Sequence, residues 1–585
     1  MWSLPNSNLI IIDFWLVFDM IISILSTKFW YSCFSGGHKV KISLERITMK
    51  KVIHYLIGTI IILLVAFIYY YITLPAINIH SPGFWWFLIS LFIIICVILG
   101  LSSFSLDKGY KNKTENSLRN GIFKVFAVLT AAIVLFFIVG SIASSPMINS
   151  SKYQRLLTIT DREFNEDIKE SSFKDIPVLD KSSATLLGSR KMGSIIEYVS
   201  QFEVADNYTQ INYQGVPTRV SPLRYGNFFK WLTNRGDGIP AFMKINMTNQ
   251  EVELVKLEQG IKYSESEHFG RYINRYLRFH YPTYIFDDIN FEINDEGTPY
   301  WICPVKEYTI GLFGGQTIGK VVLVNAITGE HEVYEIGAVP TWVDRVFSAE
   351  LLISLYDYYG TLKHGYWNSV FSQRDALQTT DGYNYIALED DVWVYTGVTS
   401  VGGDESNVGF VLMNQRTAET RYYPIAGAEE YSAMASAEGK VQHLGYQATF
   451  PLLLNIGGEP TYFIAMKDAA GLVKSYAMVN IAQYQIVAIG DSIAASEKEY
   501  KNLLSSNGIE SEDTSEKLQI TGTIKKIAQA VAEGNSHYYI LLTNSDEIFD
   551  VNIGDFIDII KYDMGDTITF TYTIGGDANI VKGIE

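Results

Sequence analysis

The sequence predicts an α+β protein with transmembrane helices at the N-terminus and a larger, β-rich body after them. Long apolar runs are confined to residues 1–149, whereas later runs alternate apolar and polar residues with the period of two that is typical of half-buried strands. Charge divides at the same place. Residues 1–149 contain 11 Lys+Arg and 5 Asp+Glu, a net charge of +6, which leaves 35 and 58, or −23, for residues 150–585. A body this acidic repels phosphate backbones, so we expect no nucleic-acid partner.

Three apolar runs without charged residues are each long enough to cross a hydrocarbon core of about 30 Å as a helix. They are Val52–Leu74, Gly83–Leu101 and Val125–Ala143. We expect residues 49–146 to form a membrane domain of these three helices, with the lipid bilayer as its first partner.

Basic residues in the loops predict the orientation of these helices. Lys50 and Lys51 precede the first run, and the loop 108–124 between the second and third runs carries five Lys or Arg residues. The loop 75–82 between the first and second runs carries none. Because short cytoplasmic loops are enriched in Lys and Arg, the N-terminus from Met49 is expected in the cytoplasm and the C-terminal body outside the cell membrane.

Residues 1–48 are predicted to be a leader upstream of the true start. The run Asn8–Leu25 is apolar but contains Asp13 and Asp19, which are costly in the middle of a membrane. The residues directly before Met49 can be encoded by a purine-rich ribosome-binding sequence. We therefore expect translation to begin at Met49.

An internal repeat organises the body. Four segments share an alternating strand, a short polar turn and a second alternating strand, at 241–257, 321–336, 409–425 and 476–490. Upstream of the second and fourth segments lies another shared piece, with Gly, then Pro, then aromatic residues, at 291–307 and 453–469.

The repeat predicts two zones of helix plus antiparallel sheet, 147–345 and 346–496. Within them, residues 260–340 and 430–491 look like two copies of one unit, with helices at Glu265–Phe279 and Ala428–His443.

The helix, the Gly-Pro-aromatic turn and the strand VVLVNAITGEHEVY resemble the PepSY-type units of bacterial exported proteins. The match covers Phe291–Ile336 well and Leu453–Gly490 more weakly, because Gln483-Tyr484-Gln485 stands where the Gly-Glu turn belongs. The whole arrangement is similar to multi-span membrane proteins of Gram-positive bacteria. The resemblance implies tandem PepSY-like units that act as binding or inhibitory modules rather than as catalysts.

A polar, acidic linker is predicted at 497–516 and a compact unit at 517–585. Five strands are expected in this unit, with a short helical stretch, Gly554–Tyr562, between the third and fourth. That order resembles a small OB-like barrel. Its 5 Lys and 10 Asp+Glu argue against a groove for nucleic acid and favour a protein contact.

No motif predicts catalysis. Gly490-Asp491-Ser492 looks like the nucleophile turn of SGNH-type esterases, with Ser492 as nucleophile. However, the one later histidine is His537, and no Asp-x-x-His follows. We instead expect Asp491 or Ser492 to cap a helix at Ile493–Leu503.

Other candidate sites have simpler interpretations. The Gly-rich segment 311–319 lacks the Lys-Ser/Thr of a phosphate loop and predicts a loose hairpin connection. The histidines lack metal-ligand spacing, and the acidic clusters at 287–288 and 389–391 lack that of a calcium loop. The aromatic stretch 355–367 predicts either a groove for a peptide or glycan or a core that joins two sheets.

We therefore expect no catalytic, metal-binding or cofactor-binding residues and no cofactor. The sequence favours a membrane-anchored extracytoplasmic binding or scaffold protein of the bacterial cell envelope, in contact with an envelope polymer or a membrane protein. Two alternatives stay open: a regulatory subunit of a membrane protease or transporter, and an envelope hydrolase whose site the sequence does not assemble.

Overall fold

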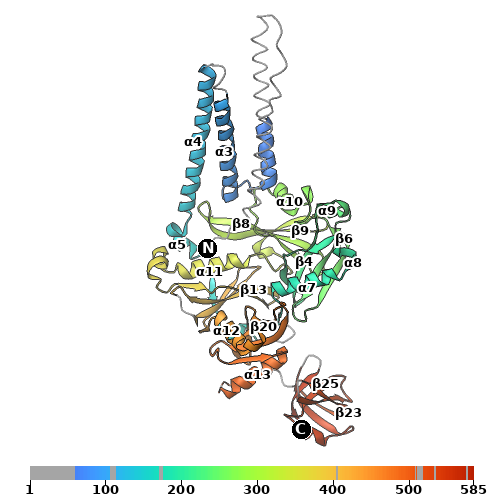
Figure 1. Cartoon of the computed structure of the whole chain (residues 1–585). Coiled ribbons are helices and arrows are strands. Elements are labelled where there is room, and N and C mark those ends of the chain that lie inside the picture. Colours follow the sequence, from blue (N-terminus) through green and yellow to red (C-terminus); the bar gives the residue numbers. More distant parts are fainter. Residues whose placement is uncertain are drawn as a thin grey trace. The chain divides into compact units, whose positions relative to one another are not determined.

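The computed structural model describes residues 60–105, 113–169, 176–402, 406–507, 509, 518–532, 535–574 and 578–584. It confirms the α+β class (Figure 1). The chain divides into two compact units, Met1–Ile72 and Thr73–Glu585. The described residues of the first unit all belong to one apolar helix, Ile60–Thr73. The predicted leader, 1–48, lies outside the described residues.

Two long apolar helices, α3 (Pro82–Ser105) and α4 (Lys113–Ala143), begin the second unit and pack along each other (Figure 1). The rings of Trp85 and Phe136 are 5.2 Å apart, and those of Phe92 and Phe126 are 5.7 Å apart. Among the described residues, one segment, Gly121–Ala143, is long and apolar enough by itself to cross a membrane; the helices Ile60–Thr73 and Pro82–Ile98 are apolar but shorter. All three predicted runs are thus helical where the structure describes them.

The body contains four consecutive copies of one unit, in which a helix precedes an antiparallel meander of four strands. The first unit consists of α7 (Lys181–Gly193), β3 (Thr209–Tyr213), β4 (Val216–Tyr225), β5 (Ile239–Asn246) and β6 (Val252–Ile261). The second consists of α10 (Ile273–His280), β7 (Asn290–Ile293), β8 (Pro299–Ile310), β9 (Gly314–Asn325) and β10 (His331–Glu335). The third consists of α11 (Ala349–Thr361), β12 (Asn384–Leu388), β13 (Asp391–Ser400), β15 (Gly409–Asn414) and β16 (Thr420–Tyr423). The fourth consists of α12 (Glu430–Lys440), β19 (Leu452–Ile456), β20 (Glu459–Lys467), β21 (Val473–Asn480) and β22 (Val487–Gly490).

Shorter elements extend these units. The additional strands are β1 (Ile159–Asp161), which runs parallel to β16, β2 (Phe202–Val204) on β4, β11 (Leu377–Thr379) on β13, β18 (Gln447–Ala448) on β20, and the ribbon of β14 (Ser406–Asn407) with β17 (Gly427–Ala428). The additional α-helices are α5 (Pro146–Tyr153), α6 (Phe164–Asp167), α8 (Ile196–Val199) and α9 (Phe228–Asn234). The short helices η2 (Phe269–Arg271), η3 (Ile336–Ala338), η4 (Asn368–Ser372) and η5 (Gln442–Leu444) lie between them. One hydrophobic core includes residues of all four units.

Each unit is closed by the same turn, at the Asn that ends its third strand. The side-chain oxygens of these residues accept hydrogen bonds from backbone N–H groups two or three positions later. The residues are Asn246, Asn325, Asn414 and Asn480. Such a side chain fixes a turn locally, which explains why the sequence repeats it.

The residue after each Asn joins the sheet to the segment before the helix. Its N–H donates to the second strand, and its carbonyl accepts a backbone hydrogen bond of 2.7–3.0 Å from the segment that precedes the helix of the same unit. The donor–acceptor pairs are Val178–Met247, Tyr263–Ala326, Phe347–Gln415 and Ala428–Ile481. The four repeated hairpins in the sequence are therefore parts of four complete units, two in each predicted zone. The helix predicted at Glu265–Phe279 begins only at Ile273, and that predicted at Ala428–His443 corresponds to α12.

The Gly-rich connection between β8 and β9 is confirmed as a hairpin, but it is held firmly rather than loosely. Ser144, directly after α4, accepts hydrogen bonds at Oγ from the N–H groups of Leu312 (2.8 Å) and Phe313 (3.2 Å). A Cβ at Gly311 or Gly314 would lie 2.4 or 2.3 Å from atoms of Ser144. The glycines are thus required for the close approach of hairpin and helix.

Helix α13 (Ile493–Ser506) belongs to the fourth unit. The Ser492 hydroxyl accepts a hydrogen bond from the N–H of Ala495, which confirms the predicted cap. The Tyr500 hydroxyl is buried and accepts hydrogen bonds from Thr461 (2.9 Å) and Asn480 (3.1 Å). The predicted linker at 497–516 is therefore wrong for residues 497–506, because these polar residues form the outer face of a packed helix.

The C-terminal part is a closed barrel of five strands, in the order β23-β24-β25-β27-β26. The strands are β23 (Leu518–Ala532), β24 (Asn535–Leu542), β25 (Ile548–Asn552), β26 (Thr567–Thr573) and β27 (Asn579–Ile584). All five predicted strands are confirmed, and the helical stretch is the short 3₁₀-helix η6 (Ile557–Lys561).

Ser144→Ala should loosen the hairpin tip, because it removes the acceptor of two part-buried N–H groups at a cost of about 1 kcal/mol. We expect faster hydrogen exchange in the peptide that covers residues 308–316. Ser145→Ala is the matched control, since the Ser145 hydroxyl donates to the carbonyl of Ile142 in α4 and, among the described residues, to no residue of the hairpin. Equal exchange in both variants would contradict this role of Ser144.

Candidate functional site

A cavity of about 420 Å³ lies at the junction of the units. Its volume is within the range of small-molecule sites, roughly 300–1,000 Å³. Residues of the first, third and fourth units line it, together with Arg345 from the connection between the second and third units. They are Asp180, Lys181, Ser182, Tyr208, Gln210, Arg219, Arg345, Glu350, Tyr383, Asn384, Tyr385, Gln415 and Phe450.

The strand register places the central residues of this site. Gln210 of β3 lies opposite Arg219 of β4, and Arg219 Nη2 donates a hydrogen bond of 3.1 Å to Gln210 Oε1. Tyr208, directly before β3, reaches α7 at Gly188, where any Cβ would lie 1.9 Å from the Tyr208 hydroxyl. A glycine in α7 is therefore needed to make room for this tyrosine.

The cavity is surrounded by hydrogen-bond donors that have no partner. Within the described part of the chain, four buried polar atoms of the lining are unpaired: Tyr208 Oη, Gln210 Nε2, Arg219 Nε and Arg345 Nε. Each of them can donate a hydrogen bond. Buried donors are nearly always paired in folded proteins, so these four are available to acceptors that enter the cavity, whether water or a ligand.

Three cations converge on the same space: Lys181, Arg219 and Arg345. Arg219 is only 4% exposed, and burial lowers the pKa of its guanidinium group to about 10, with repulsion from Arg345 adding to this effect. Partial burial of its ammonium group, followed by repulsion from Arg345 and Arg219, lowers the pKa of Lys181. Arg345 thus lies close enough to act on both of the other cations, and Arg219 lies close enough to act on Lys181.

The carboxylates of the lining are already bonded to other groups. Asp180 is the N-cap of α7 and forms an ion pair of 2.5 Å with Lys467. Although burial opposes it, the hydrogen bonds from Lys467 and Ser183 lower the pKa of Asp180. Glu350 accepts a hydrogen bond of 2.7 Å from Tyr383. Among the described residues, neither carboxylate forms an ion pair with Arg219 or Arg345, so the chemistry of the cavity favours an anion.

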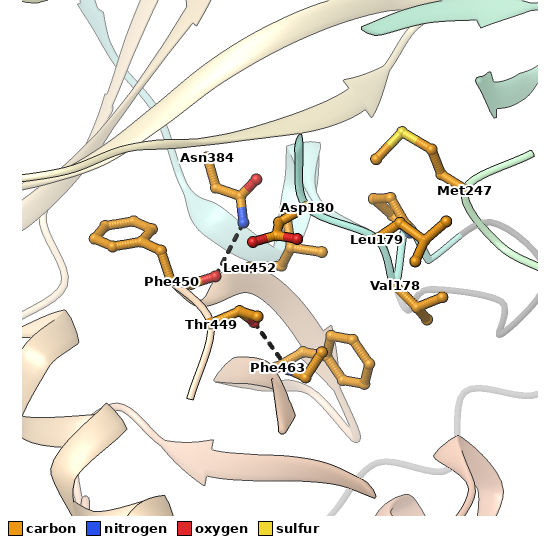
Figure 2. Close-up of a pocket in the computed structure, with 11 residues that line it drawn as sticks. Val178, Leu179, Asp180, Met247, Asn384, Thr449, Phe450, Leu452 and Phe463 are labelled. Atoms are coloured by element: carbon orange, nitrogen blue, oxygen red, sulfur yellow. Dashed lines mark hydrogen bonds between the residues drawn. The ribbon is translucent and has the colours of Figure 1, made fainter. Parts of the chain in front are cut away.

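A smaller cavity of about 20 Å³ adjoins this one and shares Asp180, Asn384 and Phe450 with it (Figure 2). The Asn384 side-chain amide donates to the Phe450 carbonyl, 3.0 Å away, as Figure 2 shows. Apolar side chains close the rest, among them Leu179 and Phe463. This space is large enough for about one water molecule, so it forms a wall of the larger cavity rather than a second site.

A buried pair of acids positions Arg345. Glu292 accepts hydrogen bonds of 2.9 Å at one oxygen from the N–H of Asp344 and at the other from the N–H of Arg345. Burial raises the pKa of Glu292 to about 7. Burial and the charge of Glu292 raise the pKa of Asp344 further. Because both oxygens of Glu292 accept N–H groups while Asp344 Oδ1 has no described partner, the proton belongs on Asp344.

The sequence-based candidates are not brought together in a site. Ser492 is used as a helix cap, and His537 in the barrel bonds to Asp550 of the neighbouring strand (2.6 Å). Glu389 and Asp390 form the two-residue turn between β12 and β13, with positive φ at both. Among the described residues, no group of three or more His, Cys, Asp or Glu side chains is arranged to hold a metal ion.

The aromatic residues of the stretch 355–367 and of the strands that follow it lie in two different places. Tyr356, Trp393 and Tyr395 are buried in the core, whereas Tyr383 and Tyr385 line the cavity. Sequence analysis missed Lys181, Arg219 and Arg345. The one available signal was a lone arginine at an inner position of the apolar strand VPTRVSPL.

No protein-family model and no curated protein sequence matches this chain. The function of the cavity is therefore inferred from its residues alone.

Asp344→Asn should make the stability of the body less dependent on pH. The raised pKa values of Asp344 and Glu292 mean that the acid pair stabilises fully at pH values below about 4, and that this contribution is lost as pH rises through about 7. In the variant, the decrease in unfolding free energy between about pH 5 and about pH 8 should be smaller than in the native chain. Urea unfolding followed by tryptophan fluorescence measures it, with exposed Asp295→Asn as control. An unchanged pH dependence in Asp344→Asn would be inconsistent with a protonated Asp344.

Proposed function

We propose that this chain is a membrane-anchored, extracytoplasmic binding protein of a bacterial cell envelope, and that its cavity holds an anionic group of an envelope polymer. The observation that carries the proposal is the set of three cations and four unpaired donors around one cavity. Phosphate or carboxylate oxygens would satisfy these donors, and bidentate contacts from arginine suit both groups.

The aromatic residues favour an anion attached to a sugar or polyol over a free inorganic ion. Tyr208, Tyr383 and Tyr385 supply aromatic surface around the cationic groups. Aromatic faces of this kind provide contact area for a ring at low entropic cost. A phosphorylated sugar or polyol unit of a cell-envelope polymer combines the two features.

The apolar helices support the membrane anchor. Gly121–Ala143 reaches spanning length, α3 packs along it, and the basic loop residues predict that the body lies outside. The four helix-plus-meander units support the assignment of the body to PepSY-like modules. The closed barrel, with a parallel pair of β25 and β27 and a helical turn before β26, supports the OB-like assignment of residues 518–584.

A regulatory subunit of a membrane protease or transporter is the second candidate. It is favoured by the contact of Ser144 with the tip of the β8–β9 hairpin, which joins α4 to the second unit. Such a contact provides a route by which occupation of the cavity could alter the membrane helices. The hydrolase alternative gains no support from any residue of the cavity.

Arg219→Met should weaken binding of a phosphorylated sugar. The variant removes one buried guanidinium group while keeping a similar volume, so it should fold at least as stably as the native chain. Isothermal titration with glucose 1-phosphate should show affinity reduced by about tenfold or more, since charged hydrogen bonds contribute about 1.5–3 kcal/mol. Uncharged glucose should bind weakly to both proteins.

Arg224→Met is the matched control for this experiment. Arg224 lies on the same strand, but it is exposed and pairs with Glu203 and Asp206 at the surface. Its loss should leave binding unchanged. Equal affinity for glucose 1-phosphate in native and Arg219→Met chains would refute the anion site.

Reporter fusions test the orientation. Alkaline phosphatase fused after Glu585 should be active, and a green fluorescent protein fused there should be dark, because the body is expected outside. Fusions after Lys108, in the basic connection that precedes α4, should give the opposite pattern. Fluorescence from the Glu585 fusion would show that the body is cytoplasmic.

A further inference from the structure

An aromatic surface is formed on the first and second units. It is defined here as the exposed residues Phe228, Phe229, His268 and Phe269 together with the buried Trp231 beneath them. The ring of Trp231 lies 5.2 Å from Phe228, 4.6 Å from His268 and 5.9 Å from Phe269. Phe228, Phe229 and Phe269 are 49%, 74% and 60% exposed. Connected exposed aromatic rings mark an interaction surface rather than ordinary solvent-facing residues.

Hydrogen bonds of buried and helix-capping residues fix the aromatic surface in place. Trp231 is buried, and its indole N–H donates a hydrogen bond of 2.7 Å to Glu267. Asn227 caps α9 by accepting hydrogen bonds from the N–H groups of Phe229 and Lys230. Phe269 has φ of 52°, an unfavourable conformation for an aromatic residue, which persists only where the surroundings impose it.

Basic residues surround the aromatic surface. Arg235 lies over the Trp231 ring at 5.6 Å, Arg271 donates to the Arg235 carbonyl, and Arg275 donates to the Phe269 carbonyl. Segments 227–237 and 268–275 together contain four cations and one acid, Asp237. The fourth cation is Lys230. In a body with a net charge of −23, this is a local reversal of sign that favours an anionic partner.

Helix α10, which contains Arg275, contacts the residues that directly follow an apolar helix. Arg278 of α10 donates a hydrogen bond of 2.9 Å from Nε to the carbonyl of Leu74, and Ile77 N–H donates to the carbonyl of Pro282 (2.7 Å). Leu74 directly follows the helix Ile60–Thr73. If the chain leaves the bilayer at the end of that helix, as the sequence predicts, α10 contacts the first residues that follow it.

We propose that the aromatic surface docks onto the outer face of the lipid bilayer, with its rings at the level of the headgroups and its basic residues against anionic phospholipids. Exposed Phe residues flanked by Lys and Arg are the composition that binds an anionic membrane surface. The proposal rests on the membrane placement stated under the proposed function. It would fix the body close to the membrane and so restrict what reaches the cavity from the membrane side.

Depth-dependent quenching tests the docking on the full chain in lipid nanodiscs. In a background with Cys33 and Cys96 replaced by Ala and the buried Cys303 retained, an environment-sensitive dye is attached at Phe229→Cys. Nanodiscs of phosphatidylcholine and phosphatidylglycerol carry a nitroxide on the lipid. We expect the dye to lose about half of its fluorescence or more, as a group at headgroup level should.

Two further dye positions separate failure of docking from failure of the membrane anchor. Val128→Cys, on an exposed position of α4, should be quenched if that helix spans the bilayer, and Tyr484→Cys, exposed in the fourth unit, should not be. Quenching at 128 but not at 229 would overturn docking and leave the anchor intact. Quenching at neither position would overturn both, and quenching at all three would show non-specific contact and overturn docking.

A charge variant tests the choice of lipid. Lys230→Glu should reduce quenching at position 229 about twofold or more in nanodiscs that contain phosphatidylglycerol. Lys440→Glu makes the same charge change at an exposed position of α12 and should not alter the quenching at position 229. Equal quenching in pure phosphatidylcholine, with no effect of Lys230→Glu, would overturn recognition of anionic headgroups.

Discussion

One backbone contact, repeated in each unit, holds the body together. The residue after each turn Asn is buried, so both its N–H and its carbonyl must be paired within the protein. The N–H bonds to the second strand, and the carbonyl bonds to the segment before the helix. This contact sets where each helix begins relative to its own sheet. Four such units then share a hydrophobic core, and the space left at their junction is the cationic cavity.

The cavity follows from that arrangement of units, but the positive charges that line it lower the stability of the fold. A buried guanidinium group without a carboxylate partner destabilises a protein, because desolvation is not offset by an ion pair. Arg219 is such a group among the described residues, and Arg345 adds a second nearby charge. Apolar residues of similar volume would pack there at lower cost. The proposed anionic ligand would offset this cost, because its oxygens would accept hydrogen bonds from these positive groups.

The second unit connects this cavity with the end of the apolar helix α4. Its β8–β9 hairpin has its tip bonded to Ser144 at the end of α4, and Trp301 and Ile302 near the other end of β8 are buried in the two main cores. Glu292 of the neighbouring strand β7 holds the backbone of Arg345. Backbone pairing within one sheet therefore joins the contact at the end of α4 to the residues that hold the backbone of Arg345.

The sequence by itself determined the features that depend on neighbouring residues: the apolar helices, the repeated hairpins around Asn325 and its counterparts, the five barrel strands and the Ser492 cap. Periodicity and turn chemistry are local, so they can be recognised without knowledge of the fold. Only the tertiary structure decided that α13 packs on the fourth unit, that the glycines around Leu312 permit contact with Ser144, and that Lys181, Arg219 and Arg345 meet. These three cations are separated by up to 164 positions in the chain. No local pattern relates them, because their proximity arises from the packing of separate units against one another.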